Sequence, residues 1–410
     1  MQGEHISRVI FEYASRIGGA RETGATLKLN ADMARDLVGA DRCSIWLIDR
    51  KASQLWTMVA HGVDELRIPL GHGLVGASVE TGETIVSNDA GNDPRLLARA
   101  SGGYETKSVL VIPLRAGDGT VIGALQALNK PGGFSPEDVN LLGLAASYSA
   151  SAIEAQRLRL EAEAAKLVMR ELEIAQEVQR RLFPESTPQL PALETAAYCR
   201  AAKSVGGDYY DFIELAGGGL FFTLGDISGK GMAAAVLMAS IQAAIRSQVL
   251  HETPQSLAGL MGTFNKAVAS FSRSERYSTL FCGQLDPTMR QLTYVNGGQA
   301  EPMLLRAATG KIERLNVGGP PVGLLSISLY SQATLTLETG DVLLCYSDGV
   351  SEAENEAGDM WEDREVKSIL KASAALSARE IQERIVAGAD AFAGNAEQSD
   401  DLTLVVLKAV

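Results

Sequence analysis

At 410 residues the chain is long enough for two or three domains, and its 46% hydrophobic and 21% charged residues indicate globular domains with substantial cores. The formal net charge of −13 argues against nucleic acid as the main partner, because nucleic-acid-binding surfaces need clustered positive charge. No apolar run approaches the ~18 residues that a membrane-spanning helix needs, which predicts no membrane partner.

Cysteine usage and the beginning of the chain indicate a cellular compartment. The cysteines are far apart and show no paired spacing, so we expect buried, inert thiols in a reducing cytosol rather than a disulfide framework or a zinc site. Residues 1–19 are amphipathic and lack the pattern of a signal peptide. The sequence therefore predicts a cytoplasmic protein. The cysteines are Cys43, Cys199, Cys282 and Cys345.

Residues 1–154 are expected to form one α+β domain. Residues 9–38 have mainly helical patterning, and several strand-like runs separated by turn-rich stretches follow. Ser135 as a cap, with Pro136 next to it, predicts the start of another helix. Helices at both ends of an antiparallel sheet are typical of a compact sensor domain. The strand-like runs are residues 43–49, 55–60, 108–114 and 121–130.

Three segments of this region together resemble a GAF domain. They are CSIWLID, PLGHGLVGASVETGETIVSND and VIPLRAGDGTVIGALQALNKPGGFSPED, and the resemblance covers roughly the first 155 residues. It implies a sensor that an unknown small molecule or protein activates. Asn129, Lys130, Phe134 and Asp138 match part of the signature of cyclic-nucleotide-binding GAF domains, but Val139 replaces an acidic residue. The alternative interpretation is a strand end, a loop aromatic and a helix start.

Residues 155–190 are expected to form a helical signalling linker and switch helix. The stretch 153–183 contains neither Gly nor Pro, and Ile153, Leu160, Leu167 and Ile174 recur every seven residues. This pattern predicts either a structural spacer or a coiled coil that joins two copies of the chain. Prolines from Pro184 onward end the helix.

Residues 191–410 are expected to form a second domain with a mixed sandwich of sheets covered by helices. Strand-like segments alternate with strongly helical ones, and hairpin-like turns are frequent. The predicted strands are 219–228, 278–286, 291–298, 341–349 and 401–410. The predicted helices are 232–250, 256–271 and 377–392.

Four short acidic motifs in the second domain predict one metal site. They are GGDYYD, GDISGKG, YSDGVSEA and SDDLTLVV, and each places an aspartate beside an apolar segment and a glycine or polar turn. Carboxylates gathered in this way repel one another unless a cation neutralises them. Oxygen ligands select hard ions, so we expect two divalent ions, Mn²⁺ or Mg²⁺. The expected carboxylate ligands are Asp208, Asp226, Asp348 and Asp400.

The ordered set of motifs resembles the metal-dependent protein phosphatase (PPM) family, and more narrowly the bacterial SpoIIE/RsbU-type serine phosphatases. The segment ELEIAQEVQRRLFP, residues 171–184, is similar to the regulatory helix before that catalytic domain. The resemblance implies an αββα sandwich with a two-metal centre. In this arrangement Asp226 bridges both ions, and the Ile227 carbonyl completes one coordination shell. Asp208 binds one ion, and Asp348 and Asp400 bind the other.

Other residues near the motifs are expected to contact phosphate or to support the ligands. Lys203 stands where some relatives have a phosphate-binding arginine, although a solvated lysine is an equally good interpretation. Asp401 follows Asp400 and is an alternative ligand. Gly207 and Asp211 complete this set. In NGGQAEP, Gln299 replaces the histidine that relatives usually carry before the proline.

These features predict a GAF-regulated, homodimeric signalling phosphatase that hydrolyses a phosphoserine or phosphothreonine protein with metal-activated water. The family resemblance implies a phosphorylated anti-sigma-factor antagonist of the STAS fold as substrate. One alternative is a catalytically inactive, phosphatase-like scaffold that binds partners. A weaker alternative is a nucleotide-signalling enzyme built around GGDYYD.

Overall fold

The computed structural model describes residues 8–9, 11–13, 23–60, 65–96, 104–251, 253–271 and 276–410. The chain divides into two compact units, Met1–Leu167 and Val168–Val410. The domain limits predicted at residues 154 and 190 stay a prediction. The expected helix over residues 9–38 lies partly outside the described residues, and α2 (Thr23–Val38) confirms its C-terminal part.

The first unit contains a six-stranded antiparallel sheet in the order β3-β2-β1-β6-β5-β4. Helix α2 and the first part of α4 pack on one face through Leu27, Leu37 and Leu142, and α3 covers the other face with Leu74. This arrangement confirms the antiparallel sheet with flanking helices. The remaining elements are β1 (Arg42–Asp49), β2 (Gln54–Ala60), β3 (Arg67–Pro69), α3 (Gly73–Thr81), β4 (Ile85–Ser87), the 3-10 turn η1 (Ala90–Asn92), β5 (Val109–Arg115) and β6 (Val121–Leu128).

The residues that match the cyclic-nucleotide signature bond to other parts of the same unit. The Asn129 side-chain oxygen accepts hydrogen bonds from the backbone N–H groups of Lys107 and Ser108. Lys130 pairs with Asp138, which also accepts hydrogen bonds from Ser135. These bonds connect the end of β6 to the start of α4, and they favour the interpretation as a strand end and a helix start.

Helix α4 (Pro136–Arg180) is a single helix of 45 residues. It begins at Pro136 as predicted, and the backbone N–H of Asp138 donates to the Ser135 hydroxyl at 3.4 Å. It continues into the stretch that we expected to form a separate signalling helix, because residues 144–180 contain neither glycine nor proline. The boundary between the two compact units falls within this helix.

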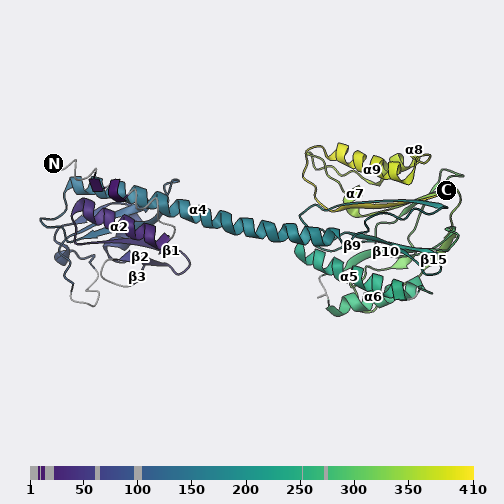
Figure 1. The fold of residues 1–410 in the computed structure, drawn as a ribbon, viewed down its shortest axis with the longest axis horizontal. Coiled ribbons are helices and arrows are strands. Elements are labelled where there is room, and N and C mark those ends of the chain that lie inside the picture. Colours follow the sequence, from purple (N-terminus) through teal and green to yellow (C-terminus); the bar gives the residue numbers. More distant parts are fainter. Residues whose placement is uncertain are drawn as a thin grey trace. The chain divides into compact units, whose positions relative to one another are not determined.

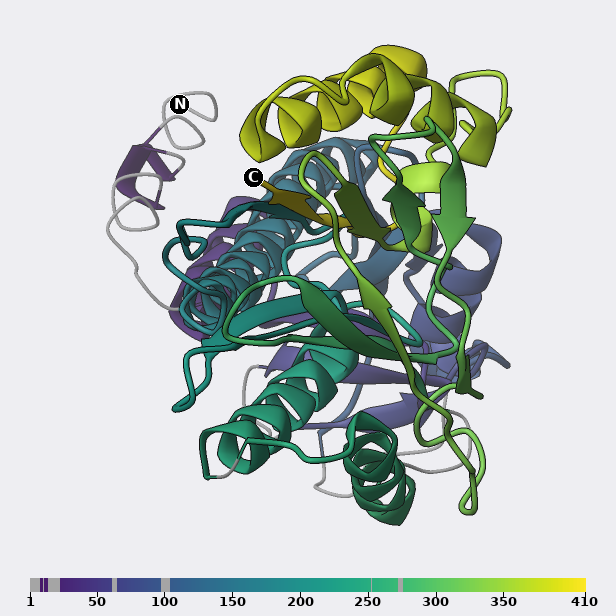
Figure 2. The same ribbon diagram turned by 90° about the vertical axis from the view of Figure 1, so that its right-hand side faces the viewer.

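The second unit is an αββα sandwich (Figures 1 and 2). One sheet has the order β14-β11-β10-β9-β8, with β15 pairing beside β11, and the other has the order β13-β12-β16-β17-β7. Aromatic and aliphatic side chains such as Phe222, Phe281 and Val405 fill the space between the sheets. Helices α5 (Met232–His251) and α6 (Leu257–Phe271) cover the outer face of the first sheet, and α8 (Asp363–Ala372) and α9 (Ala378–Ala393) that of the second.

The strands of this sandwich confirm the mixed helix-and-sheet class and extend the predicted element set. The sequence predicted β9, β10, β11, β16 and β17, whereas β7, β8, β12, β13, β14 and β15 were not predicted. Residues 341–349 were expected to be a single strand, but β16 ends at Tyr346 and Asp348 begins the short helix α7 (Asp348–Ser351). The strands are β7 (Leu193–Arg200), β8 (Tyr209–Glu214), β9 (Leu220–Ile227), β10 (Ser278–Leu285), β11 (Gln291–Gly297), β12 (Met303–Leu305), β13 (Ile312–Arg314), β14 (Gly318–Gly319), β15 (Ala333–Thr336), β16 (Val342–Tyr346) and β17 (Leu402–Ala409).

Within the described residues, α5 alone is long and apolar enough to cross a membrane by length and composition. Its residues Met238, Ile241 and Ile245 are buried against the first sheet. Helix α5 is therefore a core helix of the sandwich.

Candidate metal centre

The four predicted carboxylate ligands come from the same end of the sandwich. Asp226 lies near the end of β9, and Asp208 directly precedes β8, which pairs antiparallel with β9. Asp348 follows β16, and Asp400 lies shortly before β17, the strand that pairs with β16. Each sheet thus contributes two aspartates to one end.

Close backbone contacts bring the four motifs together in pairs. A Cβ atom on Gly207 would lie 2.8 Å from the Ile227 carbonyl oxygen and 3.5 Å from Asp226 Oδ1, so GGD packs directly on GDIS. A Cβ atom on Gly349 would overlap the Asp401 carbonyl group, so the SDG turn packs on SDD. The glycines of these motifs are therefore needed for close approach as well as for turns.

The carboxylates raise one another's pKa values. Burial, followed by repulsion from Asp348, Asp400 and Asp401, raises the pKa of Asp226 to about 7. Burial and the charge of Asp226 raise the pKa of Asp208 well above its ordinary value, although the hydroxyl groups of Thr403 and Ser347 offset part of this effect. This mutual repulsion between buried carboxylates is the electrostatic signature of a cation site.

The pKa of Asp348 is raised by burial and then by the charge of Asp400. Glu352, one turn further along the chain, is exposed, and its pKa is also raised, by partial desolvation and by the charges of Asp348 and Asp400. The excess negative charge therefore extends across the whole end of the sandwich, from the β8–β9 pair to α7.

Several features fit a hard cation, but the ligands are not gathered into a finished coordination shell. Asp208 is only 2% exposed, and its Oδ2 atom is buried without a hydrogen-bond partner. The donor set consists of carboxylates, which suits Mg²⁺ or Mn²⁺. Among the described residues, however, no three Asp, Glu, His or Cys side chains are arranged closely enough to hold an ion as they stand. Binding of an ion would therefore require side-chain rotation.

The two neighbouring aspartates of SDD have different surroundings. Asp401 accepts hydrogen bonds from the backbone N–H groups of Ala202, Gly207 and Asp208, at 2.8, 2.6 and 3.2 Å. Its side chain thus holds the GGD loop in place. Asp400 is more exposed, and its Oδ2 atom pairs with the Lys230 ammonium group at 2.9 Å. This difference supports Asp400, rather than Asp401, as the candidate ligand.

Lys230 is a site residue to which the sequence analysis assigned no role. It lies in the GKG turn between Gly229 and Gly231, which both have positive φ angles, and it also donates to the Ser399 carbonyl oxygen. Its pKa is raised, first by the hydrogen bond to Asp400. The sequence signal for this role was a lysine between two glycines, four residues after the candidate ligand Asp226.

Asp211 and Lys203 lie outside the acidic cluster. The Asp211 side chain is fully buried, accepts two hydrogen bonds from Arg246 of α5 at 2.7 and 2.9 Å, and accepts one from the Tyr209 hydroxyl. It therefore anchors α5 to β8, and nothing in this environment suggests a phosphate contact. Lys203 is exposed on the loop before Val205.

Gln299 connects the two sheets beside the centre. Its side-chain oxygen accepts a 2.6 Å hydrogen bond from the hydroxyl of Thr279, the residue paired with Asp226, and its amide donates to the Tyr346 carbonyl oxygen at 3.1 Å. Asn296 holds the Gln299 backbone. The side chain is 5% exposed and its polar atoms are engaged, so it serves as a cross-sheet tie rather than a proton carrier.

Helix α4 contacts the GGD loop directly within the second unit. The Gln179 side chain donates to the Gly206 carbonyl oxygen at 2.7 Å and accepts from the Gly206 N–H at 3.1 Å. A cavity of about 330 Å³ lies beside this contact and is lined by Gln176, Gln179, Cys199 and Asp208 among others. The end of α4 is thus joined to the residue pair that precedes a candidate ligand.

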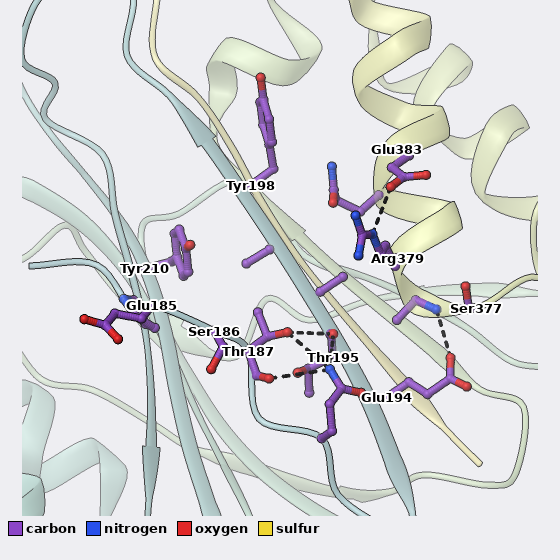
Figure 3. A pocket seen from close by; sticks show the side chains of 16 residues that line it. Glu185, Ser186, Thr187, Glu194, Thr195, Tyr198, Tyr210, Ser377, Arg379 and Glu383 are labelled. Carbon is purple, nitrogen blue, oxygen red and sulfur yellow. Dashed lines mark hydrogen bonds and ion pairs between the residues drawn. The ribbon is translucent and has the colours of Figure 1, made fainter. Parts of the chain in front are cut away.

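A larger cavity, about 770 Å³, lies between β7, the segment after α4 and the start of α9 (Figure 3). Its walls include Tyr198, Tyr210, Glu194 and Arg379, and none of the candidate ligand aspartates lines it. Thr195, on its floor, exchanges hydrogen bonds with Thr187 and Pro188. We therefore place the chemistry at the acidic cluster rather than in this larger cavity.

Family models match both parts of the chain. The GAF domain model matches residues 22–153, and the Stage II sporulation protein E (SpoIIE) model matches residues 216–410. Protein IcfG of Synechocystis sp. is 26% identical over 263 residues, which cover 58% of this chain and 41% of IcfG. Phosphoserine phosphatase RsbU of Bacillus subtilis is 28% identical over 238 residues, which cover 58% of this chain and 70% of RsbU.

A solved structure supports the fold of the second unit. The SiaA-PP2C domain of Pseudomonas aeruginosa superposes with a TM-score of 0.54 at 21% identity, covering 61% of this chain and all of that domain. The chain spans about two fifths of the length of IcfG and about two thirds of that of RsbU. It joins a GAF domain, matched over residues 22–153, to a SpoIIE domain, matched over residues 216–410.

Proposed function

We propose that the chain is a metal-dependent protein serine/threonine phosphatase. The observation that carries this proposal is the convergence of Asp208, Asp226, Asp348 and Asp400, with raised pKa values at the first three, within a SpoIIE-type domain. These carboxylates, together with the Ile227 carbonyl oxygen, would hold two divalent ions, Mn²⁺ or Mg²⁺. Such ions, when bound, polarise a phosphoryl oxygen and lower the pKa of a bound water.

The chain's own residues contribute position and charge around that chemistry. Asp401 orients the GGD loop through three backbone hydrogen bonds, and Gln299 holds the two sheets at a set separation beside Asp226. Lys230 now pairs with Asp400, and its ammonium group is partly exposed at the rim of the cluster. If Asp400 bound a cation instead, this ammonium group would be available to bind a phosphate oxygen. Lys203 lies on the adjacent loop and could add a second positive charge.

Hydrolysis of p-nitrophenyl phosphate by the full chain, with and without Mn²⁺, tests the activity. We expect Mn²⁺-dependent turnover that Asp226→Asn and Asp348→Asn each reduce by at least about 100-fold, because both lose a charged ligand. Asp390→Asn, which alters an exposed ion pair with Arg200, is the control and should keep the wild-type rate. Mn²⁺ binding in calorimetry without turnover would point to a phosphatase that awaits its activator or its specific substrate, and the absence of both turnover and Mn²⁺ binding would favour the inactive scaffold. Consumption of a nucleoside triphosphate would favour the nucleotide-signalling enzyme.

The proposed substrate is a phosphoserine or phosphothreonine protein. The similarity to a protein named phosphoserine phosphatase supports this choice, and the family resemblance suggests a phosphorylated anti-sigma-factor antagonist with a STAS fold. Matched phosphoserine, phosphothreonine and phosphotyrosine peptides, followed by mass spectrometry, test the specificity. Loss of phosphate from the phosphotyrosine peptide alone would contradict it.

We also propose that the GAF domain, through an unknown small-molecule or protein activator, controls the phosphatase by way of α4. The support is the pair of hydrogen bonds between Gln179 and Gly206, which couples the helix to the loop carrying Asp208. Gln179→Ala should weaken Mn²⁺ binding by roughly tenfold, since two hydrogen bonds are lost. Gln176→Ala, in the same cavity wall, is the control. Equal Mn²⁺ affinity in all three proteins would contradict the coupling.

Homodimer formation through α4 is the remaining part of the proposal. Leu160, Leu167 and Ile174 recur every seven residues and are 56%, 65% and 56% exposed in the single chain. A coiled coil would bury this row of side chains. Leu160→Glu with Leu167→Glu should convert a dimer to a monomer in sedimentation velocity, whereas Arg159→Glu should not. A wild-type monomer would contradict the proposal. We place the protein in the cytoplasm, without a membrane or nucleic-acid partner.

A further inference from the structure

The loop between β14 and β15 carries a concentrated group of exposed apolar side chains. Leu324, Leu325, Ile327 and Leu329 are 40%, 54%, 85% and 88% exposed. Single exposed apolar residues are common on protein surfaces, but several within one short loop mark a site of interaction. Residues 323–330 are called the apolar loop below.

The apolar loop is held in a defined conformation. Asn265 of α6, which is 1% exposed, accepts a hydrogen bond from the Gly323 N–H at 2.9 Å and donates to the Leu325 carbonyl oxygen at 3.0 Å. The Tyr330 hydroxyl donates to the same Asn265 oxygen at 3.3 Å. One buried amide thus fastens both ends and the middle of the loop, so its apolar side chains are presented without a large loss of conformational entropy on binding.

The apolar loop begins at the end of the sheet that carries the candidate metal centre. Val322 exchanges two backbone hydrogen bonds with Ser278, at 2.7 and 2.8 Å, and Ser278 pairs on its other side with Ile227, the residue after Asp226. Met232 and Val236, 45% and 60% exposed in the first two turns of α5, add apolar surface at the same end. The apolar loop therefore starts at the end of the sheet that carries the acidic cluster.

The lack of charged side chains in the loop itself restricts what the loop can bind. The chain has no charged side chain between Arg314 and Glu338, and the whole protein has a net charge of −13. A neutral loop does not attract phosphate or nucleic acid, and an anionic membrane surface would require adjacent basic residues. A folded protein with its own apolar patch is the partner that this chemistry fits.

We propose that the apolar loop docks the folded phosphoprotein substrate next to the metal centre. The proposal rests on the proposed phosphatase function and adds a recognition surface to it. The acidic cluster would act on the phosphorylated side chain, and the loop would bind an apolar patch elsewhere on the same protein. A short phosphopeptide or a small ester would not reach the loop.

The test compares Ile327→Ser/Leu329→Ser in the full chain with the control Leu250→Ser/Val410→Ser. The control residues are 63% and 40% exposed and lie at the ends of α5 and β17 that are remote from the centre. The probes are p-nitrophenyl phosphate, a phosphoserine peptide, and the intact phosphorylated STAS-domain protein that contains this peptide sequence. We expect the loop variant to lose at least about tenfold in kcat/KM on the intact protein and less than about twofold on the two small substrates.

Other results would overturn the docking proposal. These are equal losses on all three substrates, an unchanged rate on the intact protein, or a wild-type enzyme with no preference for the intact protein over its peptide. A dimer that dissociates in the loop variant would assign the loop to a second copy, and loop-dependent sedimentation with phosphatidylglycerol vesicles would assign it to a membrane.

Direct binding separates failure of this proposal from failure of the phosphatase function. Fluorescence anisotropy of the labelled phosphorylated STAS-domain protein reports docking even if no substrate is turned over. A Kd at least about tenfold weaker for the loop variant than for the control supports docking, and equal Kd values, or no binding to the wild-type chain, overturn it.

Discussion

Asp226→Asn should stabilise the metal-free protein while it abolishes metal-dependent activity. Burial and three neighbouring carboxylates raise the pKa of Asp226 to about 7 in the folded chain, whereas an aspartate in an unfolded chain has a pKa of about 3.9. The folded state therefore binds the extra proton, and the metal-free wild type loses stability as the pH rises from about 4 to about 7. Asparagine removes this charge.

The size of the effect follows from the two pKa values. The two pKa values differ by about 3 pH units, and each unit corresponds to about 1.4 kcal/mol. The stabilisation by Asp226→Asn therefore has an upper limit of about 4 kcal/mol at pH 8. Half of this value is a reasonable expectation, because the neighbouring Asp208 shares the repulsion and can take up the proton instead. For a unit of this size, roughly 2 kcal/mol corresponds to an increase in Tm of about 4–8 °C.

Thermal unfolding in EDTA at pH 5, 6, 7 and 8 measures this difference. The stabilisation by Asp226→Asn should be small at pH 5 and grow toward pH 7, and added Mn²⁺ should raise the Tm of the wild type but not of the variant. Asp286→Asn is the control with the opposite sign. Burial raises the pKa of Asp286, but hydrogen bonds from Thr288, Gln291 and Arg290 lower it by more. The Asp286 carboxylate therefore stabilises the fold at neutral pH, and this stabilisation is lost in acid. A less stable Asp226→Asn protein at pH 8, or a difference independent of pH, would refute the reasoning.

Three further changes separate structural from functional roles. Arg246→Met leaves the fully buried Asp211 without its cation, and we expect a loss of roughly 2–4 kcal/mol in urea unfolding with unchanged Mn²⁺ affinity; altered affinity would place Asp211 in the centre. Gln299→Leu removes both cross-sheet hydrogen bonds of that side chain, which should destabilise the folded protein by about 1–3 kcal/mol and weaken Mn²⁺ binding. Unchanged Mn²⁺ binding in calorimetry would show that Gln299 does not position the centre. Lys230→Met removes the ammonium group that pairs with Asp400, so Mn²⁺ affinity should rise by up to about fivefold. The KM for p-nitrophenyl phosphate should increase, because the proposed phosphate contact of Lys230 is lost. An unchanged KM would contradict that contact.

Much of the fold followed from hydrophobic periodicity and turn chemistry. The long regular helices α5, α6 and α9 and the strongly apolar strands β9, β10 and β17 were predicted within a few residues. The strand β7 was not predicted, although its eight residues form the edge of a sheet. Its sequence, LETAAYCR, has a weak alternating pattern, and it becomes a strand because β17 supplies a long antiparallel partner.

The candidate centre was predictable at the level of motifs but not of individual side chains. The sequence places Asp400 and Asp401 side by side, yet only the fold shows that Asp401 accepts backbone hydrogen bonds from the GGD loop. The cross-sheet bonds of Gln299 join residues far apart in the chain, so no local pattern could indicate them. Asp211 shares a motif with Asp208, but successive residues of a strand point to opposite faces, and only its partner Arg246 defines its role.

The contrast between Asp208 and Asp211 is the strongest physical argument for a cation. Both side chains are almost completely buried, at 2% and 0% exposure. The fold supplies Asp211 with an arginine and a tyrosine hydroxyl, whereas Asp208 Oδ2 has no hydrogen-bond partner and faces further carboxylates. A buried charge without compensation is strongly destabilising, and a chain that neutralises one aspartate could neutralise another three residues away. The hydroxyl groups of Thr403 and Ser347 offset only part of the cost of burying Asp208, and the proposed cation would supply the rest.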